Sequence, residues 1–108
     1  MDTSDRSKLI RLAASLPQGS PERVAVLSEL KVTASSEIWP DQCKPGRTYK
    51  VETGGHTELC IFRGWKVTPG GPIMEWVDAA TLMRWEAYMY HGQMSAGSSA
   101  DKILIFNP

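Results

Sequence analysis

Two cysteines and two histidines have the clearest capacity for chemistry, as metal ligands or as a nucleophile with its base. They are Cys43, His56, Cys60 and His91, and the first three follow the spacing C-x12-H-x3-C. Structural zinc sites normally supply ligands in pairs about two to four residues apart, and this spacing matches no zinc ribbon or finger. We therefore predict no metal site and no bound cofactor.

A cysteine nucleophile needs a histidine base and an orienting acid. Cys60, His91 and Asp78 supply these residue types and define the enzyme alternative, a small Cys/His site. Cys60 lies within an apolar stretch, where burial raises the thiol pKa and makes the thiol inert. Glu75 lies between Met74 and Trp76, and burial there would raise its pKa and suggest a functional role. We interpret it instead as a residue of a solvated strand face. We predict no catalytic residue.

A basic stretch with interleaved aromatic residues runs from Lys44 to Lys66. It holds five basic residues, opposed by two glutamates. A basic sheet with aromatic side chains binds single-stranded nucleic acid by phosphate neutralisation and base stacking. This pattern defines the nucleic-acid alternative, with contacts at Lys50, Arg63, Trp65 and Lys66. The opposing interpretation is a solvated strand face whose aromatic side chains point into the core.

Composition narrows the class of protein. The chain has 108 residues, 42% hydrophobic and 22% charged, which favours one globular domain over residues 1–108. Lys plus Arg and Asp plus Glu both number 12, so the net charge is zero and gives no long-range attraction to nucleic acid or anionic membranes. No apolar run approaches the roughly 20 residues of a membrane span. We expect free thiols, no signal peptide for secretion and no membrane partner.

The first third of the chain predicts an N-terminal helical hairpin over residues 1–35. From Asp5, apolar residues recur on one helical stripe: Leu9, Ile10, Leu12, Ala13 and Leu16. Ser20 is predicted to cap a second helix that starts at Pro21 and ends near 33–35. Its apolar residues recur at a spacing of three, at Val24, Leu27 and Leu30.

The segment LIRLAASLPQGSPERVAVLSELK, from about residue 8 to 31, resembles an N-terminal helix-break-helix of small proteins from tailed bacteriophages and related mobile elements. The resemblance implies a phage-like context, with the protein in the host cytoplasm or associated with the virion. It brings no catalytic residues, because the segment is structural. Residues 36–108 resemble no family that we identify, so their chemistry is left open.

The rest of the chain predicts a β-rich core over 48–108, entered through a linker at 36–47. Alternating residues and glycine turns predict strands at about 47–53, 57–67 and 72–78. Gly64 lies within the second strand and indicates a bulge or a bend. We place Leu59, Ile61, Trp65 and Val67 on one face of that strand, with Arg63 among them, and Cys60 and Phe62 on the other.

Asp78 is a plausible cap for a helix over 78–91, apolar over much of its surface. A polar loop at 92–101 and a dense apolar strand at 102–106 follow. The predicted class is therefore α+β: the helical hairpin, a small bent antiparallel sheet or SH3-like barrel, and one further helix.

The absence of an assembled polar site and the apolar helix over 79–90 favour a non-enzymatic protein-binding or structural module. Its partner would be another protein or a second copy, as a homo-oligomer. Aromatic residues dominate interface energetics, so the predicted contacts are Trp39, Trp85, Tyr88 and Tyr90. For Trp39, before Pro40, the favoured interpretation is a plug over the edge of the core, and the partner contact is its alternative.

Overall fold

The computed structural model describes residues 3–17, 19–32, 36–54, 56–90, 93–96 and 102–108. In these residues α1 is Thr3–Ser15 and α2 is Pro21–Glu29, and a short 3-10 helix covers Pro40–Gln42. The strands are β1 Thr48–Thr53, β2 His56–Thr68, β3 Gly71–Asp78, β4 Arg84–Tyr90, β5 Gln93–Ala96 and β6 Ile103–Phe106. The strands predicted at about 47–53, 57–67, 72–78 and 102–106 are confirmed.

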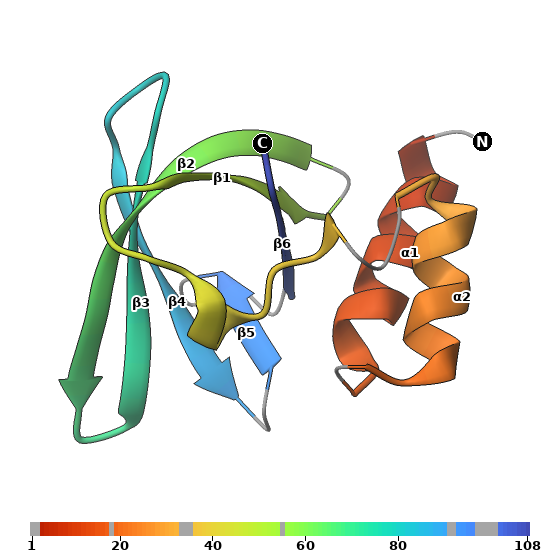
Figure 1. Cartoon of the computed structure of the whole chain (residues 1–108), viewed down its shortest axis with the longest axis horizontal. Coiled ribbons are helices and arrows are strands. Elements are labelled where there is room, and N and C mark those ends of the chain that lie inside the picture. The colour runs from red at the N-terminus through yellow and green to blue at the C-terminus, as the bar shows by residue number, and fades with distance from the viewer. Residues whose placement is uncertain (1–2, 18, 33–35, 55, 91–92, 97–101) are drawn as a thin grey trace.

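The strands described form one antiparallel sheet in the order β5-β4-β3-β2-β1-β6. Figure 1 shows α1 and α2 side by side next to this sheet, which bends strongly. The bend brings the edge strands β5 and β6 near each other. These elements confirm the predicted small α+β class.

The second helix begins as predicted and ends earlier. The Ser20 side chain accepts a hydrogen bond from the Arg23 N–H at 3.2 Å, and Pro21 is the first helical residue. Lys31 takes a φ of 60°, in the left-handed region, and the Val32 N–H then bonds to the Leu27 carbonyl. This αL closure ends α2 at Glu29, so the predicted end near 33–35, outside the described residues, is wrong.

The buried stripes of the helices also differ from the prediction. Leu12 and Val24 are 47% and 41% exposed, while Ala14 and Arg23 are buried. Both helices turn their buried faces toward a core that contains Ile10, Ala13, Ala14, Leu27, Leu30, Leu104 and Phe106.

A bulge in β2 changes the faces predicted for that strand. The pairing with β3 shifts between Phe62 and Gly64, as the mid-strand glycine indicated. After the shift Trp65 pairs with Met74, and its ring contacts Phe62 edge-on with centroids 6.2 Å apart. Trp65 and Val67 therefore lie on the face of Cys60 and Phe62, and the predicted grouping of Trp65 with Leu59 is wrong.

The helix predicted over 78–91 is a turn followed by β4. Asp78 does cap backbone N–H groups, but Leu82 takes a φ of 61° and ends the helical start after one turn. From Arg84 the chain is extended along β3, with Trp85 opposite Trp76 and Glu86 opposite Glu75. Residues 93–96 of the predicted polar loop form β5; residues 97–101 lie outside the described residues.

Strand β6 belongs to two cores. Ile103 and Ile105 lie in the sheet core with Tyr49, Val51, Cys60, Phe62, Met74, Trp76 and Ala87. Leu104 and Phe106 lie in the core formed with the helices. One edge of β6 pairs with β1, and on the other edge the Ile38 N–H bonds to the Ile105 carbonyl at 2.7 Å.

Two buried glutamates attach the helices to the rest of the chain. Glu52 of β1, fully buried, accepts a hydrogen bond from Arg6 of α1 at 2.8 Å. Glu37, which forms a bridge with Phe106, pairs with Arg23 of α2. Burial raises the pKa of Glu37, although the Arg23 guanidinium acts in the opposite direction.

We expect Glu37→Gln to lower the free energy of unfolding by about 3 kcal/mol, because it leaves the buried Arg23 charge without a counter-charge. The double variant Arg23→Met/Glu37→Leu should recover most of this loss. Urea denaturation measures both, and Glu29→Gln on the exposed face of α2 is the control. Equal urea midpoints for Glu37→Gln and the control would show that the Arg23–Glu37 pair does not stabilise the packing of α2.

Candidate functional site

The turn between β3 and β4, residues 78–83, is fixed by hydrogen bonds centred on Asp78. One carboxylate oxygen of Asp78 accepts the N–H groups of Ala80 and Thr81 at 2.8 and 2.9 Å. The Leu82 N–H bonds to the Asp78 carbonyl at 2.8 Å, and the Asp78 N–H bonds to the Met83 carbonyl at 2.9 Å. Four hydrogen bonds with Asp78 therefore close the turn.

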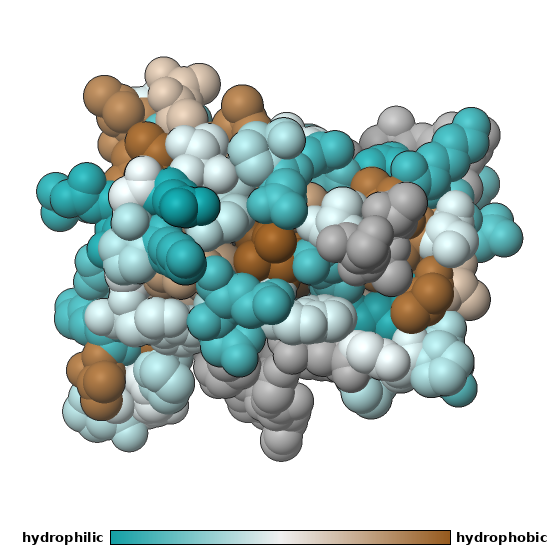
Figure 2. All heavy atoms as spheres, in the orientation of Figure 1, coloured by the Kyte–Doolittle hydropathy of each residue, from teal (hydrophilic) through white to brown (hydrophobic). Residues whose placement is uncertain are grey.

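This turn presents large apolar side chains to solvent. Leu82 and Met83 are 70% and 69% exposed, and Leu59, whose carbonyl accepts the Ala79 N–H, is 51% exposed. We call these three residues the apolar turn patch. In Figure 2 brown spheres gather at the upper left, where the turn that follows β3 lies in Figure 1. Exposed apolar side chains that gather in one place mark a candidate surface for contact with another macromolecule.

Leu82 is also held in an unfavourable backbone conformation. Its φ of 61° brings the Cβ of an L-residue close to the following carbonyl oxygen, at a cost of about 1 kcal/mol. Among the residues described, Leu82 and Lys31 are the two non-glycine positions with positive φ. Lys31 closes α2, whereas Leu82 is exposed on the turn, which makes Leu82 a candidate contact residue.

A groove of about 620 Å³ lies beside the patch, and we call it the outer groove. Its lining residues come from β2, β3 and β4. Glu75 and Val77 lie on the face of β3 opposite Met74 and Trp76, and Arg84 and Glu86 pair with them on β4. Trp76 and Trp85 also border the groove. The charged lining residues are Arg63, Lys66, Glu75, Arg84 and Glu86. Tyr88, 42% exposed, also lines it. The groove thus combines an aromatic ring with charges of both signs.

Of the predicted protein-binding residues, Trp85 and Tyr88 border the outer groove. Trp39 is half-buried, with the Arg23 guanidinium 5.4 Å from its ring centroid, which fits the favoured role of covering the core edge. Trp85 is half-buried and stacks on Trp76, with ring centroids 5.6 Å apart. Tyr90 ends β4, and its side chain lies outside the described residues.

The predicted nucleic-acid residues are divided between different surfaces. Arg63 and Lys66 both line the outer groove. Trp65, 39% exposed, contacts Phe62 on the other face of β2. Lys50 lies on β1 with its amine 4.0 Å from the buried Glu52. Two of the four residues therefore meet, together with Arg84, which the sequence interpretation missed because a helix was predicted there.

Strand pairing places Cys60 opposite Asp78 and close to Glu58, and the ligand atoms of the three lie within 4.8 Å of one another. Burial raises the pKa of the Cys60 thiol to about 11, as the apolar surroundings predict. Hydrogen bonds from Thr81 and Ala80 lower the pKa of Asp78, while Asp78 raises that of Glu58. Metal ligands must be deprotonated and free to coordinate. The Cys60 thiol is protonated, and the Asp78 carboxylate already accepts hydrogen bonds from the Ala80 and Thr81 N–H groups, so we assign no metal here.

The other chemical candidates are Cys43, His56 and His91, and the charge of His56 acts to lower the pKa of Glu58. Cys43 is buried and unbonded to Cys60, with its thiol 3.9 Å from the Trp39 carbonyl oxygen, and burial raises its pKa to about 12. His56 is exposed at the start of β2, and His91 lies outside the described residues.

Comparison with protein families, curated proteins and solved structures found no match to this chain. No helix in the described residues has the length and apolar character needed to cross a membrane.

We expect Leu82→Gly to raise the free energy of unfolding by roughly 0.5–1 kcal/mol, because glycine adopts positive φ without a Cβ clash. Leu59→Gly is the matched control: it also removes an exposed leucine, but from a regular strand, and should destabilise. Thermal and urea unfolding measure both. If Leu82→Gly destabilises as much as Leu59→Gly, the backbone of Leu82 is not strained. The conformation of the turn would then give no reason to propose a function for it.

Proposed function

We infer that the chain is a small non-enzymatic module that binds another protein, or another copy of itself, in the assembly of a phage-like system. The observation that carries this inference is Leu82, a strained and exposed leucine on a turn held by Asp78. Folding alone gains little from such a residue, because a leucine that is 70% exposed buries little apolar area. A partner with an apolar pocket would gain that burial.

The apolar helix over 79–90 no longer supports this function, because those residues form a turn and a strand. The support now comes from the apolar turn patch and from Tyr88 in the adjoining groove. A thiol site receives no support, since Cys60 is fully buried with a pKa of about 11. The sheet bends strongly and its edge strands lie near each other, which supports the proposal of an SH3-like barrel. The two adjacent helices support the proposal of a helical hairpin.

The proposed setting is the host cytoplasm or the virion, as the resemblance of residues 8–31 implies. Nucleic-acid binding is the second candidate, favoured by Arg63, Lys66 and Arg84 lining one groove. Glu75 and Glu86 in the same groove weigh against it, because they repel phosphates. Protein binding is therefore the function that we propose first.

A photo-crosslinking amino acid at position 82 tests the proposed function. We expect covalent adducts at position 82, with another copy in concentrated protein or with a partner in a lysate of the source cells. Unlabelled wild-type protein should compete for these adducts, and the Leu82→Asp/Met83→Asp variant should not.

The control places the crosslinker at Val67, which is 87% exposed near the other end of β3, opposite Pro72. Adducts of equal yield at positions 67 and 82, or no adduct at position 82 in either sample, would rule out the turn as a protein-binding surface.

A further inference from the structure

The outer groove carries charges of both signs that form no salt bridge among the residues described. Arg6 and Arg23 make salt bridges with Glu52 and Glu37, and Lys50 lies at 4.0 Å from Glu52. In the part of the chain that the structure describes, no salt bridge joins the charged groove residues, which are Arg63, Lys66, Glu75, Arg84 and Glu86. These groups are available to a ligand.

The charges follow an order set by the strand register. Glu75 and Glu86 lie directly opposite each other on β3 and β4, where like charges repel. Arg84 lies two residues from Glu86 along β4, on one side of this acidic pair. Lys66, opposite Ile73, lies on the other side, because Ile73 is two residues from Glu75 along β3. Along β3 the groove therefore presents positive, negative and positive charge at successive alternate positions.

This order matches the geometry of an extended polypeptide. Two residues of a strand span about 6.6–6.8 Å, which is also the repeat of the side chains on one face of an extended peptide. We propose that the outer groove binds an extended segment of a partner protein in which a lysine or arginine stands between two acidic residues at alternate positions.

Each side chain of the groove has a role in this binding. The basic residue of the segment lies between Glu75 and Glu86 and relieves their repulsion. Its two acidic residues pair with Arg84 and Lys66, and Arg63 adds positive charge beside them. The inference rests on the proposed protein-binding function and names the chemistry of the segment. A nucleic acid fits less well, because its uniformly negative backbone would meet the two glutamates.

Fluorescence titration of the intact chain with two synthetic peptides tests the proposal. The matched peptide contains Glu-Thr-Lys-Thr-Glu, and the reversed peptide contains Lys-Thr-Glu-Thr-Lys, each between glycine–serine flanks. At low salt we expect the matched peptide to bind about tenfold more tightly than the reversed one, or better. Glu75→Lys/Glu86→Lys should remove this preference, and the milder Glu75→Gln/Glu86→Gln should reduce it.

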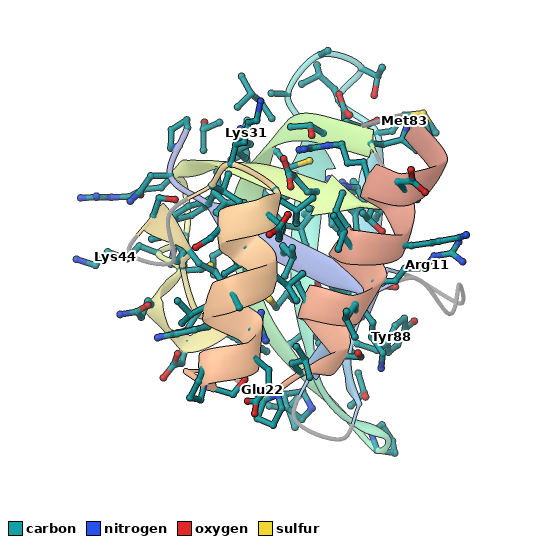
Figure 3. The ribbon with its side chains drawn as sticks, turned by 90° about the vertical axis from the view of Figure 1, so that its right-hand side faces the viewer. Arg11, Glu22, Lys31, Lys44, Met83 and Tyr88 are labelled. Carbon is teal, nitrogen blue, oxygen red and sulfur yellow. The ribbon has the colours of Figure 1, made fainter. Side chains whose placement is uncertain are left out.

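The control variant is Lys44→Glu, which changes the net charge away from the groove. Lys44 is exposed before β1, and Figure 3 shows Lys44 and Tyr88 on opposite sides of the molecule in that view. Its peptide preference should equal that of the wild type. Equal binding of both peptides, binding of neither, or tighter binding of an oligothymidylate than of the matched peptide would overturn the proposal. The crosslinking result at position 82 would be unaffected, so failure of the groove and failure of protein binding are distinguishable.

Discussion

The structure depends on the burial of both faces of β6. Ile103 and Ile105 pack into the sheet core, and Leu104 and Phe106 pack against α1 and α2. None of these four residues is more than 5% exposed. An apolar strand of this kind would be an aggregation site if its edge were free. Here β1 pairs with one edge, and the Ile38 N–H bonds to the other, so the strand is enclosed on every side.

This arrangement gives the sheet one covered region and one open region. The helices pack over β6 and β1, where Arg6 and Ser7 of α1 bond to Glu52 and to the Gly54 carbonyl. Figure 1 places both helices at one side of the sheet, away from the hairpin of β2 and β3. The outer face of β2, β3 and β4 keeps its charged groove and the neighbouring apolar turn patch. The groove and the patch therefore lie on the part of the sheet that the helices leave uncovered.

Much of the fold could be predicted from the sequence because the relevant signals are local. Alternation of Tyr49 and Val51 with polar residues defined β1, and Ser20 with Pro21 defined the start of α2. Glu52 shows the limit of this reasoning. It lies on the polar face of β1, as predicted, but Arg6 of α1 covers it and the Glu52 side chain is fully buried. No local pattern reveals which distant element will cover a strand.

The candidate site was harder to predict, since it depends on two backbone irregularities. Asp78 does cap backbone N–H groups, as predicted. The helix expected after it ends after one turn, because Leu82 adopts a left-handed backbone conformation. Trp85 and Ala87 do alternate with Arg84 and Glu86, a strand signal that the preceding apolar residues obscured. Gly64 indicated the bulge in β2. Which face of the sheet each residue after Gly64 occupies follows only from the pairing of β2 with β3.

Native-state hydrogen exchange of a Leu104→Ala variant tests the role of β6 most directly. Leu104 is 1% exposed, so its truncation should cost about 2–5 kcal/mol. If β6 unites the two cores, the amides of α1 and those of β1 and β2 will lose protection by the same free energy. Loss of protection confined to α1, with the sheet amides unchanged, would show that the helices and the sheet are separate cooperative units and would contradict this account.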